Sequence, residues 1–293
     1  MVFKIKMALV KTGRANMPEI DAYCRFFSNY YDVSVCEPNE DLSSYDILWY
    51  FMGSKGKRYR KEQFIVHEYA SLSVPPYAKV KNWIKKNIIS QPDLRVFLNN
   101  RIRDELGFTD SVQYCYRDMG VDELFFTSRR DFKFDIVYVG AVAGRNLEKA
   151  LDILLSYELQ CEILIIGKVD SDFQNSYSGK NVKFIGQVDY NKVPEYIGQA
   201  KLCLNWIPDV YPYNLQTSTK YLEYVAGNRL VISNSYPWIN FFTRENNLAY
   251  IDLNNKSEII NALNNPTVGN YNFKPMKWDE VINASMVLDL LPR

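Results

Sequence analysis

Three hydroxyl residues and a lysine stand together at the start of a helical pattern in the second half of the chain. They are Thr217, Ser218, Thr219 and Lys220, and the pattern ends at Gly227, directly before a strand-like run. A helix start offers unpaired N–H groups and the positive end of the helix dipole, and hydroxyl and ammonium groups add further donors. This arrangement predicts a site that binds a diphosphate group.

Glu223 lies one turn beyond Lys220 on the same face of the expected helix. A carboxylate at that position can accept two hydrogen bonds from the hydroxyl groups of a ribose. The alternative is an ordinary capped helix with Lys220 and Glu223 as a surface pair, and spacing alone favours it. The choice between the two depends on the elements that surround the stretch.

Short β-rich runs alternate with helical patterns along the chain, which predicts βαβ units and parallel sheets. The first series of strand-like runs is 3–10, 33–36, 47–52, 64–67, 95–98 and 112–116. The second series is 135–140, 162–167, 182–185, 202–206, 230–233 and 248–251. Helical patterns occur at 20–30, 77–87, 147–157, 194–200, 218–226, 257–263 and 278–291.

The fold class that this order predicts is α/β, with two doubly wound, Rossmann-like domains that face a cleft. A length of 293 residues suits two domains. We expect residues 1–118 to form the first domain and residues 119–275 the second, with residues 276–293 forming a helix that crosses back to the first. Ligands of such sheets bind at the carboxyl ends of the strands, so we expect the chemistry there.

Composition and missing motifs exclude several classes of protein. The chain has 35 Lys and Arg against 34 Asp and Glu, and this net charge of +1 argues against a nucleic-acid partner. Five cysteines form no CxxC pair, and His67 is the single histidine, so no metal site of several histidines can form. The motifs of dinucleotide-binding dehydrogenases, P-loop NTPases, zinc proteases and serine hydrolases are absent.

Nine cations gather between residues 53 and 86, against only two acidic residues. They are Lys55, Lys57, Arg58, Arg60, Lys61, Lys79, Lys81, Lys85 and Lys86. This region suits peripheral contact with an anionic membrane or a phosphorylated acceptor, and a solvated loop and helix face is the alternative. No apolar run approaches the roughly 18 residues that span a bilayer, and no signal peptide is visible. We therefore expect the cytoplasm or a membrane surface.

The order of elements from Gly120 to Ser233 resembles the nucleotide-sugar half of the family 4 retaining glycosyltransferases, which have the GT-B fold. Residues 120–125 (Gly-Val-Asp-Glu-Leu-Phe) are similar to the family's interdomain motif Asn-Gly-Val-Asp-x-x-x-Phe. Residues 136–155 resemble its first donor-domain strand, loop and helix, and 163–167, 182–186 and 193–196 follow the next two units. Residues 220–226 (Lys-Tyr-Leu-Glu-Tyr-Val-Ala) resemble the signature helix Lys-x-x-Glu-Tyr-x-Ala. The motifs occur in the family's order, which makes the resemblance specific.

The resemblance implies an enzyme, a retaining hexosyltransferase that needs no metal ion or other cofactor. It would move a hexose or deoxyhexose from a UDP-, GDP- or dTDP-linked donor to a hydroxyl group of a glycan or glycolipid. The donor would be held by Gly140, Arg145, Gly167, Thr217, Ser218, Thr219, Lys220 and Glu223.

The catalytic roles that the resemblance implies divide between the two domains. Arg145 and Lys220 would stabilise the leaving diphosphate. His67 or Glu68, at the end of a first-domain strand, would orient the acceptor hydroxyl group. A structural role for His67 is equally open, because a lone histidine is more often a structural residue.

The chain departs from the family's pattern at several positions. Leu215 replaces the first Glu of the motif Glu-x7-Glu, and Ala141 replaces a basic residue. The Gly-rich turn near the amino terminus is represented only by residues 11–14, so the first domain looks reduced. These departures indicate an unusual donor sugar or lost catalysis, and the alternative function is a non-catalytic sugar-nucleotide-binding or partner subunit of a glycosylation complex. Tyr236 and Trp238, in the loop expected after Ser233, could stack on a sugar, although core packing explains aromatic residues more simply.

Overall fold

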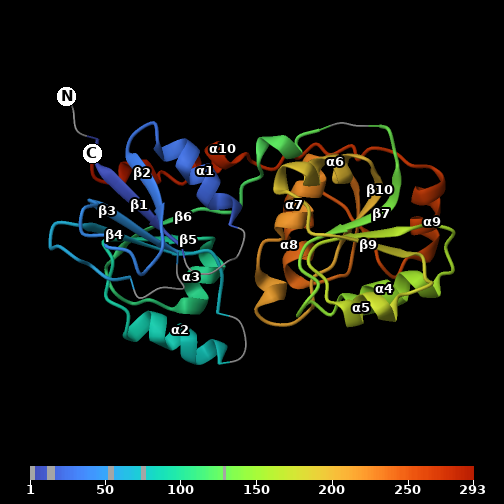
Figure 1. Cartoon of the computed structure of the whole chain (residues 1–293), viewed down its shortest axis with the longest axis horizontal. Coiled ribbons are helices and arrows are strands. Elements are labelled where there is room, and N and C mark those ends of the chain that lie inside the picture. The colour runs from blue at the N-terminus through green and yellow to red at the C-terminus, as the bar shows by residue number, and fades with distance from the viewer. Residues whose placement is uncertain (1–3, 12–16, 52–55, 74–76, 128–129) are drawn as a thin grey trace. The chain divides into compact units, whose positions relative to one another are not determined.

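The computed structural model describes residues 4–11, 17–51, 56–73, 77–127 and 130–293. The chain divides into two units (Figure 1). The first unit contains Met1–Asp122 and Met276–Arg293, and the second contains Glu123–Pro275. The limits that the sequence suggests, after residues 118 and 275, lie within a few residues of these.

The first unit is built on one sheet of six parallel strands in the order β2-β1-β3-β4-β5-β6. The strands are β1 (Lys6–Val10), β2 (Asp32–Cys36), β3 (Ile47–Phe51), β4 (Phe64–Tyr69), β5 (Leu94–Phe97) and β6 (Gln113–Tyr116). Its helices are α1 (Pro18–Phe27), α2 (Ala78–Asn87), α3 (Asn100–Leu106) and α10 (Trp278–Ala284), with a 3₁₀ turn η4 (Val287–Asp289). The sheet of the second unit also has six strands, so the two sheets are equal in strand number.

Both faces of the first sheet are covered. Side chains alternate between the faces of a strand, and Trp49 of β3 packs on Tyr23 and Phe27 of α1, with ring centroids 5.1 and 5.4 Å apart. Ile282 of α10 completes this core, whereas Ile102 of α3 packs in a separate cluster with Phe97. Figure 1 accordingly shows α1 and α10 on one side of the sheet and α3 on the other.

The second unit repeats this architecture with the strand order β12-β11-β10-β7-β8-β9. The strands are β7 (Phe134–Val139), β8 (Ile163–Ile166), β9 (Val182–Gly186), β10 (Ala200–Asn205), β11 (Leu230–Ser233) and β12 (Ile251–Asp252). The helices are α4 (Leu147–Ser156), α5 (Ser171–Ser176), α6 (Val193–Gly198), α7 (Thr219–Ala226), α8 (Pro237–Glu245) and α9 (Lys256–Asn264). Short 3₁₀ turns are η1 (Glu123–Phe125), η2 (Tyr190–Lys192) and η3 (Tyr213–Leu215). The predicted α/β class with two parallel, doubly wound sheets is confirmed.

Two local expectations are wrong. The loop after Ser233 is short and ends at Tyr236, so Trp238 lies in α8, whose first turn contains Pro237, where a proline is well tolerated. Tyr236 and Trp238 are buried there, so they pack in the core and are not available to stack on a sugar. The pattern at 278–291 is also not one helix: α10 ends at Ala284, and Met286 has a left-handed backbone with φ of 57°. In the described part of the chain, no helix is long and apolar enough to span a membrane.

Candidate functional site

The second sheet brings the predicted donor residues to one edge. β7 and β10 are neighbours, and the chain continues from β7 to β8 and β9 on one side but from β10 to β11 and β12 on the other. Open parallel sheets bind ligands at such a switch point, outside the carboxyl ends of the strands. Gly140 follows β7, Gly167 follows β8, and α7 begins in the connection between β10 and β11. All three segments therefore lie on the side where a ligand is expected.

Two glycines allow these segments to approach one another. Gly140 and Gly167 have φ values of 137° and 155°, which side chains rarely adopt. A Cβ on Gly167 would overlap the carbonyl oxygen of Gly140, and a Cβ on Gly140 would lie 3.5 Å from Nζ of Lys220. A side chain on Gly167 would therefore push the two loops apart, whereas one on Gly140 would lie in ordinary contact with Lys220 but in a strained backbone conformation.

The start of α7 is fixed by a buried hydrogen-bond network. The hydroxyl group of Ser218 accepts from the backbone N–H of Tyr221 at 3.3 Å and donates to Oδ1 of Asn205 at 2.7 Å. Asn205 in turn donates to the hydroxyl groups of Ser233 and Tyr236 at 2.9 and 3.1 Å. Ser218 thus holds the helix start against the end of β10. Direct contact between its hydroxyl group and a ligand stays a prediction, as it does for the neighbouring Thr217 and Thr219.

A second set of hydrogen bonds, made by Tyr224, holds α7 against the sheet. The hydroxyl group of Tyr224 accepts from the backbone N–H of Val139 at 3.1 Å and donates to the carbonyl of Leu204 at 3.4 Å. It therefore bridges β7 and β10 at the switch point, which fixes the position of the helix that carries Lys220 and Glu223.

Arg145 and Lys220 are two cations whose charges interact. The guanidinium of Arg145 lies 4.5 Å from the ring centroid of Tyr213, and the ammonium of Lys220 lies 5.6 Å from that of Tyr138. Burial and, next, the charge of Arg145 lower the pKa of Lys220 to about 8, although Glu223 opposes the shift. Among the described residues, neither cation has a carboxylate oxygen within 4.0 Å. Two cations held together in this way suit an anion with several charges.

Glu223 is buried and oriented. Its Oε1 accepts a hydrogen bond from the hydroxyl group of Tyr190 at 3.2 Å, and the Tyr190 ring packs on Phe125 at a centroid distance of 5.4 Å. Tyr190 is not among the site residues expected from the sequence. No sequence signal connects it to Glu223, because the two residues are 33 positions apart.

Glu68 in the first unit belongs to a buried network of hydrogen bonds and an ion pair. It forms an ion pair with Arg117 and accepts a hydrogen bond from Nε1 of Trp49 at 2.7 Å. Arg117 also donates through Nε to the hydroxyl group of Tyr23 at 2.7 Å, and both charged side chains are almost fully buried. This placement favours a structural role for Glu68, and its part in orienting an acceptor stays a prediction.

His67 is enclosed in the same strand. Only 1% of its surface is exposed, and the rings of Tyr50 and Tyr69 lie edge-on to it. A Cβ on Gly56 would overlap its imidazole ring. Burial and, next, the charge of Arg95 lower the pKa of His67 to about 3, so the ring is neutral at physiological pH. The backbone of Gly56, beside the ring, opposes this shift. These surroundings favour the structural reading of His67, and its catalytic role stays a prediction.

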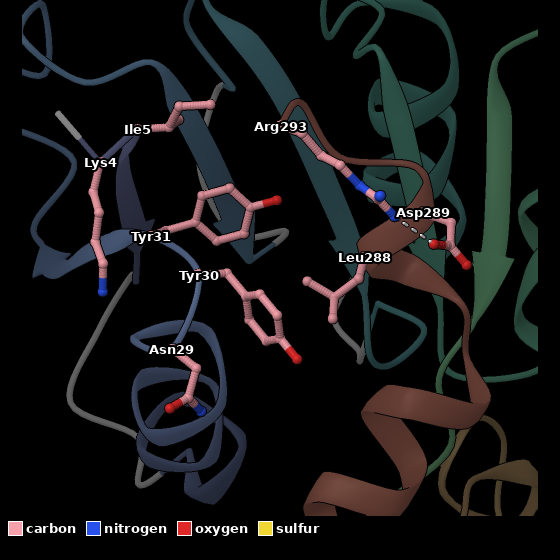
Figure 2. A pocket seen from close by; sticks show the side chains of 8 residues that line it. All are labelled: Lys4, Ile5, Asn29, Tyr30, Tyr31, Leu288, Asp289 and Arg293. Atoms are coloured by element: carbon pink, nitrogen blue, oxygen red, sulfur yellow. Dashed lines mark hydrogen bonds and ion pairs between the residues drawn. The ribbon is translucent and has the colours of Figure 1, made fainter. Parts of the chain in front are cut away.

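Two cavities of the first unit lie outside the predicted sites. One, of about 650 Å³, lies at the amino end of β1 and is lined by Lys4, Ile5, Asn29, Tyr30, Tyr31, Leu288, Asp289 and Arg293 (Figure 2). Several of its polar groups have partners: Tyr31 donates to the carbonyl of Pro292 at 3.0 Å, and Arg293 pairs with Asp289 at 2.9 Å. It lies at the edge opposite the carboxyl ends of the strands and holds none of the predicted residues.

The other cavity, of about 410 Å³, lies at the carboxyl edge of the first sheet. Its polar lining includes Asn99, Asn100, Tyr116 and Asp118, which the sequence analysis did not select. The signal that could have found them is their position, directly after β5 and β6.

Comparison with known proteins identifies the fold. No family model matches the chain, and no curated protein matches its sequence. Sucrose-phosphate synthase from Thermosynechococcus elongatus matches with a TM-score of 0.66 and 14% identity over 89% of each chain. Anabaena Alr3699/HepE, solved in complex with UDP-glucose, matches with 0.65 and 11% over 89% of each chain. AviGT4, a glycosyltransferase of avilamycin A biosynthesis, matches with 0.60 and 11% over 97% of this chain and 92% of its own.

The shared architecture is the GT-B fold, which this chain has. A putative UDP-N-acetylglucosamine 2-epimerase from Listeria monocytogenes matches as well, with a TM-score of 0.54 and 10% identity over 98% of this chain and 96% of that one. The fold is therefore common to transferases and epimerases, and the reaction must be argued from the site.

Proposed function

We propose that the protein is a glycosyltransferase that moves a hexose or deoxyhexose from a nucleoside-diphosphate sugar to a hydroxyl group of a glycan or glycolipid. The observation that carries this proposal is the pair of cations, Arg145 and Lys220, held beside the start of α7 at the carboxyl edge of the second sheet. A diphosphate supplies the negative charge that this pair lacks. The GT-B fold and the UDP-glucose complex of HepE support a nucleotide sugar as its source.

In the proposed reaction, the bond between the anomeric carbon and the phosphate oxygen breaks. The leaving nucleoside diphosphate gains negative charge, while the sugar becomes oxocarbenium-like. Arg145, Lys220 and the N–H groups at the start of α7 stabilise the leaving group, which requires neither a metal ion nor a cofactor. Retention follows the family that the sequence resembles, with the leaving phosphate accepting the proton of the acceptor.

Glu223 binds the ribose of the nucleotide sugar in this proposal. Its buried carboxylate, oriented by Tyr190, accepts hydrogen bonds from the two ribose hydroxyl groups. Gly140 and Gly167 let the two loops at the strand ends approach each other beside Lys220, because neither has a side chain there. The acceptor belongs to the first unit in this proposal, at the carboxyl edge where His67, Glu68 and the 410 Å³ cavity lie.

The test is thermal unfolding of the full chain with UDP, GDP, dTDP, ADP and CMP. At about a hundredfold excess over the dissociation constant, a bound nucleotide adds roughly 2.7 kcal/mol. We expect one nucleotide to raise Tm by several degrees, and Lys220→Ala and Glu223→Ala to lose this shift. Lys149→Ala, on the exposed surface of α4, is the matched control. No shift with any nucleotide would contradict the donor site.

A non-catalytic sugar-nucleotide-binding subunit is the second candidate, and Leu215 and Ala141 favour it because each replaces a polar group of the resembled family. The two candidates differ in turnover. Slow hydrolysis of the matching nucleotide sugar without acceptor supports the transferase. Binding without hydrolysis or transfer supports the subunit.

A further inference from the structure

Helix α2 presents an apolar stripe to solvent. None of its residues is buried. Val80, Trp83, Ile84 and Ile88 are exposed by 54%, 57%, 37% and 63%. Their spacing places them on one face of the helix, because residues three, four and eight positions apart are neighbours along a helix surface. This face serves no packing purpose within the described chain.

Lysines flank the stripe on both sides. Lys79 and Lys86 lie along one border, Lys81 and Lys85 along the other, and the helix contains no acidic residue. The opposite side attaches the helix to its unit: Oδ1 of Asn82 accepts from the backbone N–H of Ser73 at 3.2 Å. Figure 1 shows α2 at the margin of the first unit, beyond α3 and away from the sheet.

The arginines of the basic region are used inside the unit and do not extend this surface. Arg58 pairs with Asp93 at 2.7 Å and donates to the carbonyl of Gln63. Arg60 donates to the carbonyls of Ser43 and Tyr45. The exposed lysines of α2, Lys79, Lys81 and Lys86, carry the basic surface beside the stripe, whereas Lys85 is half-buried and burial lowers its pKa.

We propose that α2 docks on the surface of an anionic lipid bilayer. The stripe enters the boundary between headgroups and acyl chains, with Trp83 at the depth that tryptophan prefers, and the lysines reach the lipid phosphates. Charge complementarity selects this occupant. Protein interfaces are depleted in lysine, whereas helices that lie on membranes combine lysine with tryptophan and aliphatic residues. The inference rests on this surface alone and does not depend on the proposed function.

The fluorescence of Trp83 tests the proposal directly. Of the five tryptophans it is the exposed one, at 57%, whereas Trp49, Trp206, Trp238 and Trp278 are exposed by 8% or less. We expect vesicles of phosphatidylcholine with about 30% phosphatidylglycerol to shift the emission to the blue. Brominated acyl chains should quench it. Pure phosphatidylcholine should do neither, and the signal should vanish in Trp83→Phe.

Vesicle flotation of variants measures the contribution of charge. Lys79→Gln with Lys86→Gln should weaken partitioning roughly 30-fold, since each lysine near an anionic surface contributes about fivefold. Lys149→Gln with Lys183→Gln makes the same change of net charge on exposed residues of the second unit and should have little effect.

Several results would overturn the proposal. These are an unchanged Trp83 emission with anionic vesicles, equal binding to phosphatidylcholine, or equal losses from both lysine pairs. Concentration-dependent dimerisation that Trp83→Ser abolishes, without vesicle binding, would assign the stripe to a second copy of the chain instead.

Discussion

Both units have charged residues at the carboxyl edge of a parallel sheet, but the two sets of residues differ in their neighbours. In the first unit, Glu68 near the end of β4 is paired with Arg117 and hydrogen-bonded to Trp49. In the second unit, Arg145 and Lys220 beside the ends of β7 and β10 lie close together, and the pKa of Lys220 falls to about 8 through burial and the charge of Arg145.

This difference in neighbours distinguishes a charged residue that stabilises the fold from one that can bind a ligand. Each charge of a buried ion pair is neutralised by its partner, so the pair offers no net charge to a ligand, and removing one partner leaves the other charge buried and unpaired. Two like charges held together lower the stability of the free protein, and they persist where a ligand of opposite charge repays the cost. At the strand ends of this chain, the cations of the second unit are therefore better placed to bind an anion than Glu68 is to bind an acceptor.

The largest expected effect comes from breaking the compensated pair. Arg117→Met leaves the carboxylate of Glu68 buried without its partner, and we expect the free energy of unfolding of the first unit to fall by about 3–5 kcal/mol. Denaturant unfolding measures it. The double variant Arg117→Met with Glu68→Leu should be more stable than Arg117→Met alone, because no unpaired charge remains. A single variant as stable as the wild type would show that Glu68 is not committed to the pair and would restore it as a candidate acceptor residue.

Removing one cation from the second unit should have the opposite effect on stability. Lys220→Ala should leave the stability of the free protein unchanged or raise it, since it removes the repulsion from Arg145. The same change should weaken nucleoside diphosphate binding by about 1.5–3 kcal/mol, or roughly 10- to 150-fold, as expected for a charged hydrogen bond. Calorimetric titration gives the affinity, and Lys149→Ala is the control. A variant that loses stability but keeps its affinity would place Lys220 with Glu68 among the structural charges.

The titration of Lys220 provides a pH test of the same contrast. Its pKa of about 8 lies below the ordinary 10.5, so between these values the unfolded chain binds more protons than the folded one. The free energy of unfolding should therefore gain a contribution from Lys220 as pH rises from about 8 to 10.5. Diphosphate affinity should fall over the same range, by up to about tenfold per pH unit, as the ammonium loses its proton.

Lys220→Arg is the reference for this measurement, because a guanidinium stays charged throughout the range. The difference between the wild type and Lys220→Arg in affinity, measured from pH 7 to 9.5, isolates the lysine from all other groups. Parallel profiles for the two proteins would show that Lys220 does not contact the anion.

Local sequence patterns predicted the sheets and one side of the site. Buried parallel strands appear as short apolar runs, such as Ile-Leu-Ile-Ile at β8, and each of the twelve strand-like runs overlaps a strand of the structure. Lys220 and Glu223 could be selected because both lie on one helix, where spacing fixes the face.

Contacts between distant elements could not be predicted. The pairing of Glu68 with Arg117 joins β4 to the segment after β6, so His67 and Glu68 looked like a free site from the sequence. The orientation of Glu223 by Tyr190 crosses 33 residues and leaves no local pattern. Helix α8 was missed for a different reason, since Tyr236-Pro237 resembles the start of a turn as much as of a helix.

The smallest expected effect concerns the contact between Tyr190 and Glu223. Tyr190→Phe removes the hydrogen bond from the Tyr190 hydroxyl group to the carboxylate of Glu223 but keeps the ring packed on Phe125. The loss should be about 0.5–1 kcal/mol, or two- to fivefold in affinity for the ribonucleotide. It should be confined to ligands whose ribose hydroxyl groups engage Glu223, so affinity for the matching 2′-deoxynucleotide should change less. Equal losses for both nucleotides would mean that Tyr190 supports the fold of the site. An effect restricted to the ribonucleotide would place Glu223 at the ribose and show that the hydroxyl group of Tyr190, from a different element of the unit, orients its carboxylate.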